Sequence, residues 1–275
     1  MPIVGVFDSG FGGLTVLRAL LPLVPNAHYV YLGDTARLPY GAKSQGTIAR
    51  YAVEAARFLA ARSADMLVIA CNTATALALE DIRAAVQIPV IGVIEPGAKA
   101  AHDAIHATGI SIEATHPEVL VLATAATVQS HAYLAACAQL GLKATEVACP
   151  LLVPLVEEGW TDHHVTREVI RIYLADALSR CTPRAVVLGC THYPLIAHEI
   201  EAALRELGSD ALVVDAARAT AEATSHALGT HAPASPLAPA TFECFATDSV
   251  EKFQRLGTHF LGKPMPPVTL LDLGG

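Results

Sequence analysis

Short apolar runs alternate with longer helix-like stretches along the chain, and this alternation restricts the fold more than any other feature. Runs rich in Val and Ile predict strands over residues 3–7, 29–32, 66–70, 90–94, 119–123, 144–148, 185–188, 211–214 and 241–245. Segments with helical spacing lie between them, at 12–23, 47–62, 74–85, 129–140, 163–179, 194–207, 218–228 and 249–261. Continuous apolar strands are typical of parallel sheets covered on both faces. The sequence therefore predicts an α/β protein with mainly parallel sheets flanked by helices.

The composition excludes several classes of partner. The 275 residues are 53% hydrophobic and carry a net charge of −8, with no basic stripe. Nucleic acid and anionic membranes are therefore poor candidate partners, and a small polar ligand fits better. The N-terminal apolar run stops at Asp8 and has no basic residues before it, which predicts neither a signal peptide nor a membrane span. We expect a cytoplasmic protein, whose six cysteines, lacking any CxxC pair, are free thiols.

Polar residues follow directly where the predicted strands end. In α/β sheets, ligands bind beyond the carboxyl ends of the strands, so these residues are the first candidates for a site. They are Asp8-Ser9, Gly33-Asp34-Thr35, Cys71-Asn72-Thr73, Thr124 and Cys190-Thr191-His192.

The landmarks of the first half recur in the second. Asp8 and Cys71 are 63 positions apart, Thr124 and Cys190 are 66 apart, and "LVIACNTA" resembles "VVLGCTHY". Any two α/β halves share some offsets, but a true repeat predicts two pseudo-symmetric lobes, 1–97 plus 213–275 and 98–212. Cys71 and Cys190 would then lie on opposite walls of a cleft between the lobes.

Two facing thiols restrict the chemistry. A zinc site needs about four N or S ligands, often in close pairs, and only Cys190 and His192 are close in the sequence, so we predict no metal. A cysteine hydrolase would use Cys190 with His192 and leave Cys71 without a role. Removing a proton from one side of a carbon while delivering one from behind uses both thiols, and that reaction is racemisation. The other cysteines fit small buried hydrophobes: Cys137, Cys149, Cys181 and Cys244.

The motifs together resemble the glutamate racemase family. They are "GVFDSGFGGLTVLRAL" (5–20), "YLGDTARLPYG" (31–41), "ACNTAT" (70–75), "PVIGVIEPGAKAA" (89–101), "ATAATVQSHAY" (123–133), "CPLLVPLVEEG" (149–159) and "VVLGCTHYPLI" (186–196). The segment 242–262 also resembles that family's C-terminal part. The chain departs from the usual pattern in a longer stretch at 102–117 and in Asp215-Ala216, where the family often has Asp-Ser.

The resemblance implies a cofactor-independent enzyme that acts on L- and D-glutamate. By this likeness Cys71 takes the α-proton from D-glutamate and Cys190 from L-glutamate. Asp8 would support Cys71, and Glu157 and His192 would support Cys190, with Asp34 nearby. The implied substrate-binding residues are Asp8, Ser9, Pro39, Tyr40, Gly41, Asn72, Thr73, Thr124, Thr127, Thr191 and His192. The resemblance also implies a homodimer that supplies D-glutamate for peptidoglycan synthesis.

Three alternatives stay open. The chain could racemise another amino acid of the same family, or be a two-lobed binding protein without catalysis. "GFGG" (10–13) with Asp34 partly imitates a dinucleotide fingerprint, which would indicate an oxidoreductase, although Thr15 occupies the place of the third glycine. No lysine follows a strand-end motif, so we expect no pyridoxal phosphate and no other cofactor.

Overall fold

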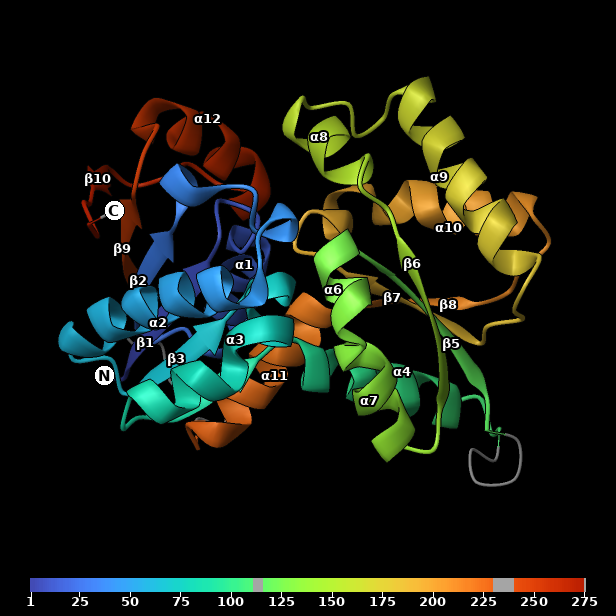
Figure 1. Cartoon of the computed structure of the whole chain (residues 1–275), viewed down its shortest axis with the longest axis horizontal. Coiled ribbons are helices and arrows are strands. Elements are labelled where there is room, and N and C mark those ends of the chain that lie inside the picture. The colour runs from blue at the N-terminus through green and yellow to red at the C-terminus, as the bar shows by residue number, and fades with distance from the viewer. Residues whose placement is uncertain (111–115, 230–239, 275) are drawn as a thin grey trace. The chain divides into compact units, whose positions relative to one another are not determined.

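The computed structural model of the chain describes residues 1–110, 116–229 and 240–274 (Figure 1). Two compact units divide it: Met1–Val93 with Thr220–Gly275, and Ile94–Ala219. In the described residues no helix has both the length and the apolar character needed to cross a membrane.

The first unit is built on a six-stranded parallel sheet. Its strands lie in the order β10-β9-β2-β1-β3-β4, which are Val268–Leu270, Thr241–Ala246, His28–Gly33, Ile3–Asp8, Met66–Ile69 and Val90–Gly92. Every residue of β3 is buried, so both faces of this inner strand are covered. Burial on both faces is why the strand reads as a continuous apolar run in the sequence.

Helices pack in pairs against this sheet. They are α1 (Leu14–Leu23), α2 (Gln45–Ala61), α3 (Asn72–Ala85) and α12 (Val250–Leu261), with short 3-10 turns η1 (Thr35–Arg37) and η2 (Tyr40–Ala42). Helix α2 contacts α3, and α1 contacts α12. Phe7 and Ile69 from the sheet meet Leu59 of α2 and Ile82 of α3 in one core. A further helix, α11 (Ala216–Ala227), runs across the division between the units.

The second unit has a four-stranded parallel sheet. Its order is β6-β5-β7-β8, which are Lys143–Ala148, Glu118–Ala123, Ala185–Gly189 and Leu212–Asp215. The helices are α4 (Ile94–His106), α6 (Ala125–Ser130), α7 (Ala132–Gln139), α8 (Leu152–Glu157), α9 (His164–Leu178) and α10 (Ala197–Glu206), with the 3-10 turn η3 (Tyr193–Ile196). Figure 1 shows α4 and α7, which contact each other, on one side of the sheet and the contacting pair α9 and α10 on the other.

The strand order supports the repeat inferred from the sequence. The order β2-β1-β3-β4 in the first sheet matches β6-β5-β7-β8 in the second. Strands β3 and β7 hold equivalent places, and Cys71 and Cys190 follow them. The two thiols are therefore equivalent positions of two similarly built units.

The expected lobe boundaries differ from the observed division. We expected the chain to re-enter the first lobe at residue 213. However, strand β8 pairs with β7 and therefore belongs to the second unit. The second unit also begins at Ile94, where α4 starts, and not at residue 98. Apolar patterning locates strands well, but it does not show which sheet an edge strand joins.

Several elements were predicted wrongly or missed. The strand predicted to end at residue 94 stops at Gly92, and helix α4 was not predicted, although Pro96 in its first turn is a typical helix-start signal. The helix predicted over 129–140 is two helices that meet at His131, whose φ of 54° breaks the helical path. Strand β10 and helix α8 were also missed. Of the long stretch at 102–117, the first part completes α4, and residues 111–115 lie outside the described residues.

The glycine-rich segment after β1 serves close packing. A Cβ at Gly13 would lie 2.6 Å from the Cβ of Asp8 and 2.8 Å from that of Ala70. Gly13 precedes α1, so its missing side chain lets this helix start directly against the ends of β1 and β3. The resemblance to a dinucleotide fingerprint therefore has a packing explanation.

We expect Gly13→Ala to destabilise the protein by about 1–3 kcal/mol, because buried backbone must shift to admit the methyl group. Gly46→Ala is the matched control, since nothing lies within 4 Å of a Cβ at this position in α2. It should change the free energy of unfolding by less than about 1 kcal/mol, in the stabilising direction. Urea unfolding followed by circular dichroism measures both, and equal effects would contradict the packing role.

Candidate active site

Cys71 lies at the end of β3, where the chain turns into α3. Its sulfur caps that helix, since the Ala74 amide donates to Sγ at 3.4 Å. Strand β1 pairs with β3, which brings Asp8 and Ser9 beside the thiol. The thiol donates to the Ser9 hydroxyl at 3.4 Å, and the buried Asp8 carboxylate accepts from the Gly10 amide at 2.9 Å.

The surroundings of Cys71 favour the neutral thiol. Burial is the largest cause, and the negative charge of Asp8 adds to it, so that the pKa of Cys71 rises to about 12. Hydrogen bonds from Ser9 and the Ala74 amide act in the opposite direction but are weaker. Without a substrate, Cys71 is therefore a proton donor at neutral pH.

Asp34 holds the segment that contains Tyr40. Its fully buried carboxylate accepts from the Tyr40 hydroxyl at 2.6 Å and from Thr247 at 2.9 Å, and Arg37 lies 3.6 Å away. Burial raises the pKa of Asp34, and these neighbours lower it in part. These contacts give Asp34 a positioning role toward the Pro39-Tyr40-Gly41 turn.

Sequence reasoning missed Arg37 and Thr247. Arg37 lies in a 3-10 turn, pairs with Glu54 at 2.8 Å and donates to the Gly274 carbonyl. Thr247 follows β9, which pairs with β2 so that the two strand ends coincide. Only the strand order, with β9 beside β2, could have suggested it.

Asn72 and Thr73 form the first turn of α3, and both are buried. Helix first turns present backbone N–H groups that suit a carboxylate. The structure thus places these two predicted substrate-binding residues directly after Cys71, at a position where an anion can be bound.

In the second unit, a thiol, an imidazole and a carboxylate form a chain of contacts. Cys190 follows β7, and its sulfur lies 3.8 Å from Nδ1 of His192. Nε2 of His192 lies 3.4 Å from Oε1 of Glu157 at the end of α8. Thr191 also approaches Nδ1, at 3.4 Å. Three predicted catalytic residues are therefore linked through His192, which contacts both Cys190 and Glu157.

His192 is favoured in its charged form. Burial by itself lowers the pKa of this imidazole, but the hydrogen bonds and charges of Cys190 and Glu157 raise it to about 10. An imidazolium beside a thiol stabilises the thiolate. The electrostatic setting of Cys190 is thus the opposite of that of Cys71, which faces a carboxylate.

Thr124 and Thr127 lie near the end of the neighbouring strand. Ala123 pairs with Gly189, so Thr124 and Cys190 follow adjacent strand ends. Thr124 caps α6, accepting from the Thr127 amide at 3.4 Å, and the two hydroxyls are 3.0 Å apart. They offer hydroxyl groups beside the second thiol.

All six cysteines are free and buried, as the sequence predicted. The four outside the strand-end motifs pack as small apolar groups. Cys149 and Cys181, for example, donate to the backbone carbonyls of Val147 and Ala177.

Comparisons with known proteins agree with this arrangement. The Asp/Glu/Hydantoin racemase family matches residues 12–224. A glutamate racemase from Koribacter versatilis (strain Ellin345) is 51% identical, over 100% of this chain and 98% of its own. The crystal structure of glutamate racemase from Thermus thermophilus in complex with beta-chloro-D-alanine has 38% identity and a TM-score of 0.84, covering 99% of this chain and 97% of that one. The D-glutamate complex of the Francisella tularensis enzyme has 31% identity and a TM-score of 0.85, covering 99% and 98%.

Two parallel α/β units, with full-length likeness to glutamate racemases, define an enzyme of the amino-acid racemase class. The chain belongs to the Asp/Glu/Hydantoin racemase family. The resemblance to glutamate racemases inferred from the sequence is confirmed.

We expect His192 to titrate with a midpoint near 10, and Glu157→Gln to lower that midpoint because the carboxylate stabilises the imidazolium. NMR of the imidazole Cε1 proton, assigned with His192→Asn, measures it. The exposed neighbour gives a matched control, Glu158→Gln, which should leave the midpoint unchanged. A wild-type midpoint near the ordinary value of about 6.5 would contradict the charged state.

Proposed function

We propose that this chain interconverts L- and D-glutamate without an added cofactor, with Cys71 and Cys190 acting on opposite faces of the α-carbon. The observation that carries the proposal is the equivalence of the two thiols. Both are buried, and each follows the equivalent strand of its own sheet, in two sheets with the same strand order. The names of its relatives support glutamate as substrate, and the Francisella tularensis relative was crystallised with D-glutamate.

Proton transfer starts from opposite charge states at the two thiols. In the direction from L-glutamate, the Cys190 thiolate, held by the imidazolium of His192, forms its S–H bond as the Cα–H bond breaks. Cys71 then breaks its S–H bond and gives its proton to the other face of the α-carbon. The negative charge has moved from one sulfur to the other, so protons and charge balance. From D-glutamate the same steps run in reverse.

The neighbouring carboxylates complete the proton transfer. Asp8 makes a thiolate at Cys71 costly, so this sulfur holds a proton until the carbanion needs it, and Asp8 can accept a proton when Cys71 acts as the base. The ammonium group of the bound substrate supplies the positive charge that the first unit lacks. Glu157 performs the corresponding function for His192 in the second unit.

The remaining strand-end residues bind the substrate carboxylates. Hydroxyl, amide and backbone donors gathered at these positions stabilise the developing carbanion through the α-carboxylate. The proposed set is Asp8, Ser9, Pro39, Tyr40, Gly41, Asn72, Thr73, Thr124, Thr127, Thr191 and His192. Asp34 acts in this scheme through Tyr40.

The family likeness extends the proposal to the cell. The enzyme works in the cytoplasm and supplies D-glutamate for peptidoglycan synthesis. It acts as a homodimer, for which a dimer mass in sedimentation is the direct test and a monomer mass at all working concentrations the contrary result.

We expect the circular dichroism of an L-glutamate solution to decay toward zero when the purified protein is added without cofactor. Other amino acids offered in parallel should keep their signal, because the proposal names glutamate. A signal from glutamate that stays constant with folded protein would reject the activity, and decay only with another amino acid would reassign the substrate.

Substrate analogues with a leaving group on the adjacent carbon separate the two thiols, because elimination needs only one base. We expect Cys71→Ser to retain elimination from the L-analogue and lose it from the D-analogue, with Cys190→Ser showing the reverse. Both variants should lose racemisation, since a serine hydroxyl is far less acidic than a thiol.

Cys181→Ser serves as the control for these variants, because Cys181 is a buried thiol of the second unit that lies outside the strand-end motifs and donates to the Ala177 carbonyl. It should retain both activities. Equal loss of both eliminations in Cys71→Ser and Cys190→Ser, in folded proteins, would contradict the assignment of one face to each thiol, and loss of both eliminations in only one variant would leave that cysteine as the sole catalyst.

A further inference from the structure

A buried carboxylate outside the catalytic residues joins two helices of the second unit. Glu199, in the first turn of α10, has only 5% of its surface exposed. Both of its oxygens accept from Nε of Arg167 on α9, at 2.8 and 2.9 Å. Proton transfer to glutamate does not require this ion pair, so its burial calls for another explanation.

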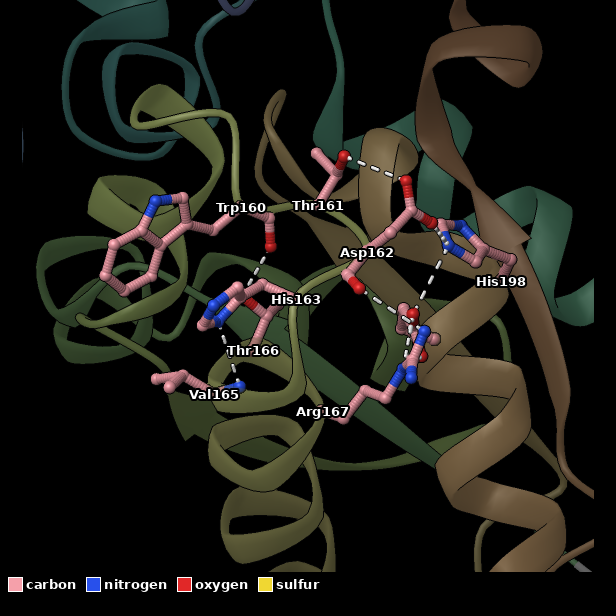
Figure 2. Close-up of polar contacts among 9 residues, drawn as sticks. Trp160, Thr161, Asp162, His163, Val165, Thr166, Arg167 and His198 are labelled. Atoms are coloured by element: carbon pink, nitrogen blue, oxygen red, sulfur yellow. Dashed lines mark hydrogen bonds and ion pairs between the residues drawn. The ribbon is translucent and has the colours of Figure 1, made fainter.

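The same ion pair reaches the loop between α8 and α9. Arg167 donates through Nη2 to the carbonyl of Asp162 at 3.3 Å. His198, next to Glu199, contacts the Asp162 carboxylate at 2.8 Å. Figure 2 shows this loop held from both helices, and Thr166 adds a hydrogen bond to the Trp160 carbonyl at 2.6 Å.

The group is an ion-pair network rather than a metal site. Asp162, His198 and Glu199 bring three possible metal-binding atoms within 4.8 Å of one another. A cation among them would have to displace Arg167 from both oxygens of Glu199 and then lie next to a guanidinium. Like charges at that distance oppose binding, whereas the existing contacts satisfy the buried carboxylate.

Both ends of the network lead directly to catalytic residues. The loop begins just after Glu157, the last residue of α8, and its Trp160 amide donates back to the Leu155 carbonyl at 2.9 Å. Helix α10 follows η3, which begins just after His192. The Arg167–Glu199 pair thus closes a ring that starts and ends at the 3.4 Å contact between Glu157 and His192.

We propose that Glu199 and Arg167 are positioning residues for the Cys190 half of the reaction. By tying the loop after α8 to α10, they hold Glu157 against His192, which keeps the imidazole beside Cys190. The inference rests on the proposed function for the role of Cys190 in catalysis, but the contact itself can be tested without turnover.

The test is the pH dependence of Cys190 alkylation by iodoacetamide, followed by mass spectrometry of the Cys190 peptide. The titratable groups that influence or adjoin this thiol are His192, Glu157, Cys149, Tyr133 and Tyr193. In Glu199→Gln we expect the midpoint to rise by about one pH unit, a tenfold loss of thiolate. Racemisation should lose about tenfold in kcat with less than about threefold change in KM, as expected for a misplaced catalytic group.

A merely structural role predicts a different result, with no change of the midpoint. Loosened packing would expose Cys190 and speed its alkylation at an unchanged midpoint, and that result would overturn the proposal. The midpoint of Cys71, in the other unit, is measured in the same sample and should not move. Glu168→Gln is the matched control, because it removes an exposed carboxylate–arginine pair from the same helix without reaching the loop.

A second variant covers the case in which Glu199→Gln does not fold. Arg167 is 59% exposed, so Arg167→Gln leaves no cavity, and it should raise the Cys190 midpoint in the same direction. The double variant should shift the Cys190 midpoint no more than the more affected single variant does, since the residues act through one pair.

If wild-type protein fails to racemise glutamate while the Cys190 midpoint still shifts, the proposed function fails and the positioning role stands. An unshifted midpoint in an active enzyme refutes the positioning role alone.

Discussion

A buried thiol loses the solvation that its anion needs, so the charged group placed beside it decides whether it can act as a base. Cys71 has a carboxylate for a neighbour and remains protonated, with a pKa of about 12. Cys190 has an imidazole whose own pKa rises to about 10 through contact with that thiol and with Glu157. The two half-sites are equivalent in the fold, but the charged groups beside their thiols are of opposite sign, and the proposed reaction, which takes a proton at one sulfur and gives one at the other, uses that difference.

The fold supplies these charged neighbours through its parallel strand order. Asp8 reaches Cys71 because β1 pairs with β3, and Thr124 follows the strand end next to that of Cys190 because β5 pairs with β7. Gly13 keeps the first of these junctions compact, since any side chain there would displace Asp8. The residues proposed to act directly on the substrate thus follow from strand pairing, whereas we propose that Glu157 is held in place by the ion pairs of α9 and α10.

This distinction explains what the sequence could predict. Asp8, Cys71 and Cys190 follow buried apolar strands, and a strand end is visible in hydrophobic periodicity, so the parallel α/β fold and the position of these residues at strand ends were predicted correctly. Arg37, Thr247, Arg167 and Glu199 lie in turns and helices and join segments far apart in the chain, and no periodicity marks such ion pairs and hydrogen bonds. The start of α4 was misread for a related reason, because the apolar run 90–94 continues unbroken from strand into helix. The domain boundary near β8 depends on which sheet that edge strand joins, and strand pairing in the folded chain decides this rather than local sequence.

The central claim is that two thiols serve opposite faces of one α-carbon, and solvent deuterium tests it most directly. Glutamate of one enantiomer is incubated with the enzyme in deuterium oxide and both enantiomers are analysed by mass spectrometry at low conversion. Two bases predict deuterium at the α-carbon of the newly formed enantiomer, delivered by the second, exchanged thiol, while the recovered starting enantiomer remains unlabelled. Deuterium in both enantiomers from the first turnovers, or in neither, would contradict the account.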